Sequence, residues 1–80
     1  MTNPARILEK LRARPTSLRY SQVVTLLGEL DWQIRPSKTG SHTICTSPRG
    51  TTVTVPQSNG QVSWIYLNQL LKEIERGGGV

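Results

Sequence analysis

The spacing of hydrophobic residues along the chain is the feature that most constrains its fold. Apolar residues recur every three or four positions before and after a central stretch in which apolar and polar residues alternate. These repeats predict helices over about residues 4–14 and 21–30, strands over about 32–34, 42–46 and 51–55, and a last helix that ends at Gly77–Gly79. Because the connections between the strands are short, we expect an α+β fold: a three-stranded antiparallel sheet with helices packed on one face.

Residues typical of helix starts and tight turns mark the ends of these elements. Ser21 and Ser63 stand where an N-cap is expected for the second and the last helix. Ser47–Gly50 has proline at its second position and glycine at its fourth, which favours a type I turn. The polar loop 57–61 contains the turn signal Asn59-Gly60. From Ser21 onward the predicted order is α-β-β-β-α, the order of the double-stranded-RNA-binding fold, preceded here by an extra N-terminal helix.

The charge of the chain points to a polyanionic partner. Ten Lys and Arg residues stand against five Asp and Glu residues, so the formal net charge is +5 over 80 residues. No acidic residue occurs from Trp32 to Leu71, whereas Arg35, Lys38 and Arg49 lie inside this span. Such a span is typical of a phosphate-binding surface, which favours nucleic acid over an anionic membrane. The alternative is a solvated basic surface without a ligand.

Composition also disfavours several classes of protein. No apolar run approaches the roughly 20 residues of a membrane helix, and the N-terminal residues lack the apolar region of a signal peptide, so we expect a cytoplasmic protein. Cys45 and His42 are the only residues of their kinds and cannot supply a structural zinc site. The carboxylates are scattered along predicted helices, which argues against a metal-dependent nuclease. We therefore expect neither a metal nor another cofactor.

His42 is the natural candidate for a catalytic group. Histidine is the residue type that changes charge near neutral pH, and His42 follows the short segment Gly40-Ser41 in the basic span. Attack of the 2′-hydroxyl of RNA on its own phosphate needs a base, an acid and positive charge, but no metal. Gly40 would let the backbone approach a phosphate, Ser41 could donate a hydrogen bond, and Lys38 or Arg35 could stabilise the developing negative charge.

Two questions about His42 stay open at the level of sequence. A second proton carrier would have to be Lys38, Tyr20, Tyr66 or water. Strand alternation places His42 on the same face as Ile44, which we expect to be the face covered by helices. On that arrangement His42 would be a half-buried residue with a structural hydrogen bond, which is the alternative to catalysis.

Other conspicuous residues favour structural interpretations. Trp32 and Trp64 adjoin apolar patterns, so we expect them in the core or partly buried rather than stacked on bases. Cys45 has no activating neighbour in the sequence, which favours a buried thiol over a nucleophile. The four basic residues of the first helix form either an RNA-facing ridge or a solvated helix face: Arg6, Lys10, Arg12 and Arg14.

A series of short motifs resembles the HicA family of type II toxins. The motifs are Arg19-Tyr20-Ser21, Leu26-Leu27, Asp31-Trp32, Gly40-Ser41-His42-Thr43-Ile44, Pro48-Arg49-Gly50 and Val53-Thr54-Val55-Pro56. The resemblance covers about residues 17–75. It implies a helical extension over residues 1–16, a HicA-like domain over 17–76 and a glycine-rich tail over 77–80.

The resemblance also implies a function. HicA proteins are mRNA interferases, which are metal-independent endoribonucleases silenced by a HicB-type antitoxin that covers the active face. The catalytic histidine of the family corresponds to His42, supported by Gly40 and Ser41. We expect the basic residues Arg19, Arg35, Lys38 and Arg49 to bind RNA. The alternatives are a non-catalytic RNA-binding module of the same fold and, less favoured, a domain whose basic face binds only an acidic protein.

The sequence departs from the family pattern in two places. Typical members carry a polar or basic segment after the Val-Pro pair and start the last helix with a Gly-Thr-Leu motif. Here the segment is Gln57–Gln61 and the helix opens with Trp64–Leu67. We therefore expect the contribution of this side of the molecule to RNA binding to differ from that of the family.

Overall fold

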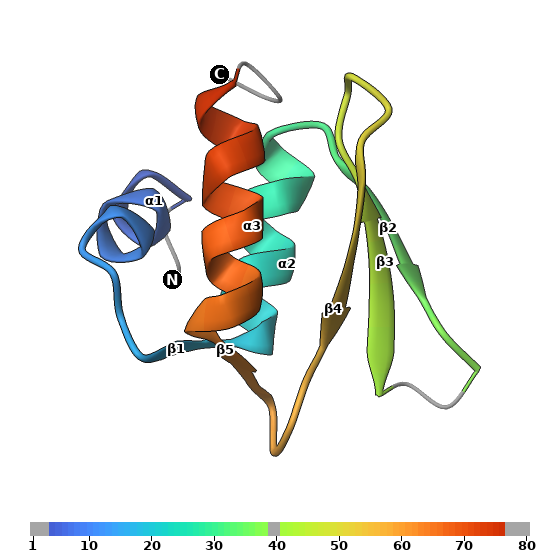
Figure 1. Ribbon diagram of the computed structural model, residues 1–80, viewed down its shortest axis with the longest axis horizontal. Coiled ribbons are helices and arrows are strands. Elements are labelled where there is room, and N and C mark those ends of the chain that lie inside the picture. Colours follow the sequence, from blue (N-terminus) through green and yellow to red (C-terminus); the bar gives the residue numbers. More distant parts are fainter. Residues whose placement is uncertain (1–3, 39–40, 77–80) are drawn as a thin grey trace.

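The computed structural model describes residues 4–38 and 41–76, which form three helices and five strands (Figure 1). In chain order these are α1 (Pro4–Arg12), β1 (Ser17–Arg19), α2 (Tyr20–Glu29), β2 (Gln33–Pro36), β3 (His42–Thr46), β4 (Thr52–Pro56), β5 (Gln61–Ser63) and α3 (Trp64–Glu75). The predicted helices and the three central strands are therefore confirmed. No helix within these described ranges is long and apolar enough to cross a membrane.

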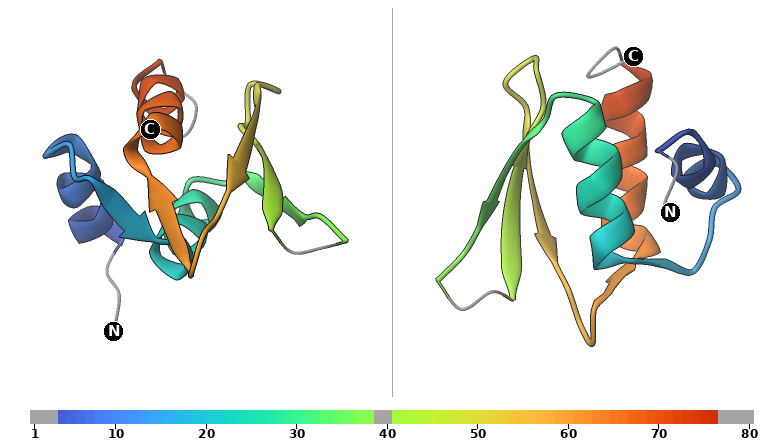
Figure 2. Two further views of the ribbon diagram at one scale, coloured as in Figure 1. Left: turned by 60° about the horizontal axis from the view of Figure 1, so that its bottom comes forward. Right: turned by 180° about the vertical axis from the view of Figure 1, so that it is seen from behind.

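The main sheet is antiparallel, with strand order β2-β3-β4. Its register places Ile44 between Arg35 and Thr54, and His42 opposite Pro56. The helices α2 and α3 cover one face of this sheet, and no described element covers the other (Figures 1 and 2). This arrangement confirms the predicted α+β class with helices on one side of a three-stranded sheet.

A single hydrophobic core lies between the sheet and the helices. It combines the apolar stripes of α2 and α3 with the inward residues of the strands, and its most buried members include Leu27, Val55, Leu67 and Ile74. The helix α1 packs on α2 and α3, on the side away from the sheet (Figure 2). Through Ile7 and Leu11, each only 1% exposed, α1 joins the same core.

Sequence periodicity missed a second, two-stranded sheet. The strands β1 and β5 pair antiparallel with Leu18 opposite Val62, in segments where the sequence predicted only connections: the stretch between the first two helices and the stretch from the polar loop 57–61 to Ser63. Each strand has only three residues, so neither shows a readable alternation. The turn before β5 was predicted correctly: Asn59 and Gly60 have φ of 53° and 75°, the conformation that an Asn-Gly turn provides.

The second sheet also changes how the helices begin. The helix α2 starts at Tyr20 rather than after a Ser21 cap. The backbone N–H of Tyr20 donates to the Gly60 carbonyl at 2.7 Å. Ser63 does precede α3 as predicted, but its side chain makes no capping hydrogen bond. The N–H of Trp64 donates instead to the Thr16 carbonyl at 2.9 Å. The carbonyls of Gly60 and Thr16 therefore satisfy the first backbone N–H of α2 and of α3.

Candidate functional site

His42 is the first residue of β3, at the end where the chain enters from β2, and the alternation of exposed and buried residues along β3 places it on the uncovered face of the sheet. Its side chain is exposed, and Ile44 on the same face is 40% exposed. The prediction that these two residues share a face is correct, but the expectation that helices cover this face is wrong. The covered face carries Thr43 and Cys45, which pair with Val55 and Val53 and are nearly inaccessible to solvent. His42 is therefore not a half-buried residue of the core.

Hydrogen bonds hold His42 at both its ring and its backbone. The Ser41 hydroxyl lies 3.1 Å from Nδ1 of the imidazole, and the direction of this bond depends on the tautomer. The N–H of Ser37 donates to the His42 carbonyl at 2.8 Å, and the His42 N–H donates to Oγ of Ser37 at 3.4 Å. No residue in the described ranges makes a hydrogen bond with Nε2. As far as the described residues go, Nε2 is therefore the ring nitrogen that can exchange a proton with a ligand.

Two of the predicted RNA-binding residues lie close to His42. Arg35 is exposed on the same open face and pairs with Ile44. Since His42 is two residues before Ile44 on β3, Arg35 and His42 are diagonal neighbours on adjacent strands. Lys38 is exposed and directly follows Ser37, the residue that is hydrogen-bonded to the His42 backbone. The predicted supporting residue Gly40 falls outside the described residues. Two cationic residues, Arg35 and Lys38, thus lie at the same end of the sheet as the imidazole.

Arg49 lies at the opposite end of β3, in the turn that leads to β4. Its Nη1 donates to the Arg76 carbonyl at 3.0 Å, and its Nε lies 3.7 Å from Oε2 of Glu73. The Glu73 side chain is only 4% exposed and also accepts a hydrogen bond from Oγ of Ser47 at 3.0 Å. Arg49 therefore attaches this turn to the end of α3 and is not brought together with His42.

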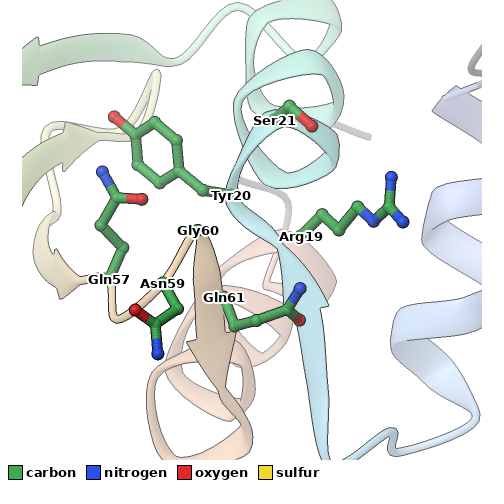
Figure 3. A pocket seen from close by; sticks show the side chains of 7 residues that line it. All are labelled: Arg19, Tyr20, Ser21, Gln57, Asn59, Gly60 and Gln61. Carbon is green, nitrogen blue, oxygen red and sulfur yellow. The ribbon is translucent and has the colours of Figure 1, made fainter.

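Arg19 lies at the end of β1, immediately before α2. Figure 3 shows its side chain extending toward α1, away from the ring of Tyr20. The predicted RNA-binding residues therefore do not form one cluster. The four basic residues predicted on the first helix are all exposed, although α1 ends before the last of them: Arg6, Lys10, Arg12 and Arg14. Their exposure fits both an RNA-facing ridge and a solvated surface.

Sequence reasoning missed a cavity near His42. It has a volume of about 470 Å³ and is lined by residues from two segments that are distant in sequence, 19–21 on one side and 57 with 59–61 on the other (Figure 3). Tyr20, one of the possible second proton carriers, lines it and shares a 2.6 Å hydrogen bond with Oγ1 of Thr43. Tyr66, another of these carriers, packs against the core from α3. The Asn59-Gly60 signal predicted the turn, but no local signal predicted the cavity.

The remaining candidates have structural roles. Burial raises the pKa of the Cys45 thiol to about 11, so the thiol is protonated at neutral pH and is not an activated nucleophile. Trp32 is buried and Trp64 packs partly buried against the core, as predicted. Within residues 4–38 and 41–76, no group of three or more His, Cys, Asp or Glu side chains is placed to hold a metal ion.

Comparison with known proteins agrees with the motifs found in the sequence. Residues 20–75 match the family model described as the HicA toxin of bacterial toxin-antitoxin systems. The match begins at the first residue of α2 and ends at the last residue of α3, so it leaves out α1 and β1. Neither the curated proteins nor the solved structures gave a significant match. Because the family model covers most of the chain, including the Ser41-His42 site, the protein belongs to the HicA family of toxins.

Proposed function

We propose that this HicA toxin is a metal-independent endoribonuclease that cleaves mRNA, with His42 as the general acid/base. The observation that carries this proposal is the exposed imidazole on the open sheet face, with Nδ1 held by Ser41 and Nε2 without a partner in the described residues. A histidine with one nitrogen fixed and the other facing solvent is oriented for proton transfer. Arg35 and Lys38 supply positive charge at the same edge.

The proposed reaction is attack of a ribose 2′-hydroxyl on the adjacent phosphorus. The bond from phosphorus to the 5′-oxygen of the next nucleotide breaks, which leaves a 2′,3′-cyclic phosphate and a free 5′-hydroxyl. Nε2 of His42 accepts the proton of the 2′-hydroxyl or donates one to the leaving 5′-oxygen, and water or a second side chain serves the other step. Arg35 and Lys38 stabilise the extra negative charge of the pentacovalent phosphorane.

Membership of the family implies an antitoxin partner. We propose that this partner is HicB-like and covers the open face of the sheet around His42. Ile44 is 40% exposed on that face and offers an apolar contact beside the charged Arg35. An antitoxin bound there would exclude RNA from the imidazole. The partner of this face is then either substrate or antitoxin, but not both.

The test compares the wild-type protein with His42→Ala on end-labelled single-stranded RNA in excess EDTA. Removal of a general acid/base is expected to lower the cleavage rate by about 10²–10⁴-fold. Because His42 is exposed, the free energy of unfolding should change by less than about 0.5 kcal/mol. Thr52→Ala is the matched control and should cleave like the wild type, because Thr52 is exposed on the same sheet face but pairs with Thr46 at the opposite end of β3 from His42.

The product ends and the binding data decide between the alternatives. Cyclic 2′,3′-phosphate ends from wild type but not from His42→Ala support the proposal. If neither protein cleaves RNA although both bind it in a salt-sensitive way, the chain is a non-catalytic RNA-binding module. If His42→Ala loses about 1–3 kcal/mol of stability together with RNA binding, the histidine is structural.

A further inference from the structure

The cavity between the start of α2 and the β4–β5 connection is not lined by His42, Arg35 or Lys38, the residues named for the proposed cleavage step. Its volume of about 470 Å³ lies within the roughly 300–1,000 Å³ typical of small-molecule sites. Its walls come from Arg19, Tyr20 and Ser21 on one side and from four residues of the segment 57–61 on the other: Gln57, Asn59, Gly60 and Gln61 (Figure 3). The segment 57–61 is also where the sequence departs from the family pattern.

Two hydrogen bonds connect the walls of this cavity to the residues on either side of His42. The Tyr20 hydroxyl and Oγ1 of Thr43 are 2.6 Å apart. The backbone N–H of Gln57 donates to the carbonyl of Ser41 at 3.0 Å. The cavity walls are therefore tied to Ser41 and Thr43, the two chain neighbours of His42, although the Thr43 side chain lies on the covered face and the imidazole on the open face.

The lining has the chemistry of a nucleobase site rather than of a phosphate site. Three side-chain amides line it, those of Gln57, Asn59 and Gln61, and each amide has both donor and acceptor atoms, as the edges of nucleobases do. The ring of Tyr20 adds an aromatic surface of the kind on which bases stack. The only cationic residue of the lining is Arg19, and its side chain extends away from Tyr20 toward α1 (Figure 3).

Several of these groups are already held in place. Oε1 of Gln61 accepts a hydrogen bond from Oγ of Ser17 at 3.1 Å, which orients the amide. Asn59 and Gly60 occupy a tight turn closed by reciprocal 2.9 Å backbone hydrogen bonds between Ser58 and Gln61. Groups that are ordered before binding lose little conformational freedom when a ligand arrives.

We propose that this cavity is a nucleotide subsite that binds the base of an RNA residue next to the cleaved phosphate and so sets the cleavage-site preference. The inference rests on the proposed function for the identity of its ligand, a single-stranded RNA. One base enters the cavity, and the sugar–phosphate chain passes over the edge of the sheet to His42. Sequence preference then resides in Gln57, Asn59 and Gln61, whereas the rate of the chemical step resides in His42.

The first test is a titration of the ¹⁵N-labelled protein followed by NMR, with the four ribonucleoside 3′-monophosphates as probes and inorganic phosphate as the control. We expect the amide signals of Gln57, Asn59, Gly60 and Gln61 to shift with the nucleotides, with affinities that depend on the base. Phosphate alone should not reproduce these shifts. If phosphate gives the same shifts with the same affinity, or if all four nucleotides bind equally, the base-binding subsite is refuted.

The second test removes one amide without disturbing the turn. Asn59→Gly is suitable because Asn59 has φ of 53°, a conformation that glycine adopts without strain. Loss of one base-contacting hydrogen bond should weaken nucleotide binding by about fivefold and change the distribution of cleavage sites on a mixed-sequence RNA. Gln69→Ala, an exposed amide on α3 outside the cavity, is the matched control. An Asn59→Gly protein with wild-type affinity and wild-type cleavage sites would refute the subsite.

The two readouts separate this inference from the nuclease proposal. If the nucleotides shift the cavity signals but RNA is not cleaved, the subsite stands and the nuclease proposal fails. If RNA is cleaved but the nucleotides shift only the signals of Ser41 and His42, the nuclease proposal stands and the subsite fails.

Discussion

The two faces of the main sheet use alternate residues of the same strand for different purposes. On the covered face, Thr43 and Cys45 are 1% and 2% exposed and pack under the helices. On the open face, His42 and Ile44 are exposed, although they alternate with Thr43 and Cys45 along the same strand. Because successive side chains of a strand point to opposite faces, a sheet covered on one side buries every second residue in the core. The residues between the buried ones are exposed and can take part in chemistry or bind partners.

The largest expected effect on stability comes from placing a negative charge on the covered face, compared with the same charge on the open face. Cys45→Asp would bury a carboxylate among core residues, at a cost of several kcal/mol, which is a large share of the stability of a domain of 80 residues. Ile44→Asp would face Arg35 across the strand pair and should cost at most about 1 kcal/mol, the range of strand propensities. Urea unfolding followed by circular dichroism measures both variants.

The two substitutions concern adjacent residues of one strand, so each is the control for the other. Cys45→Ala separates the effect of the charge from the loss of the thiol. Similar losses of stability in Cys45→Asp and Ile44→Asp would mean that the two faces do not differ in burial, and the contrast between them would be lost.

Much of this architecture could be predicted from the sequence because it depends on local repeats. The stripe of Leu67, Leu70 and Ile74 predicted α3, and the alternation around Val53 and Val55 predicted β4. Contacts between distant segments could not be predicted in this way. The pairing of β1 with β5 joins residues more than forty positions apart, and the cavity beside it depends on that pairing.

The position of His42 shows a second limit of the sequence. The alternation of side chains along a strand correctly predicts that His42 and Ile44 share a face, but it does not predict which face the helices cover. The apolar Ile44 suggested the covered face, whereas the structure buries the polar Thr43 there and satisfies its hydroxyl with Tyr20. Similarly, nothing near Arg49 reveals that the distant Glu73 will engage its guanidinium.

A prediction of intermediate size concerns the hydroxyl of Thr43. Tyr20→Phe removes its partner and leaves a buried hydroxyl unsatisfied, so the free energy of unfolding should fall by about 1–3 kcal/mol. Adding Thr43→Val replaces that hydroxyl by a methyl group of similar size and should recover part of the loss. A double-mutant cycle measured by chemical unfolding gives the coupling. Strictly additive losses would show that the 2.6 Å contact contributes no stability.

The smallest predicted effect concerns the pH dependence of stability and depends on Cys45. Burial on the covered face raises the pKa of its thiol from 9.0 to about 11 in the folded protein. Between these pH values the unfolded chain loses the thiol proton first, so it binds fewer protons than the folded protein and the free energy of unfolding falls as pH rises. Below about pH 9 both states keep the proton and the thiol contributes no pH dependence. From pH 8 to pH 10, the wild type should therefore lose about 1 kcal/mol more than Cys45→Ala, since the other titrating groups are common to both proteins. Parallel urea titrations at the two pH values measure the difference, and equal losses would place the thiol in contact with water rather than under the helices.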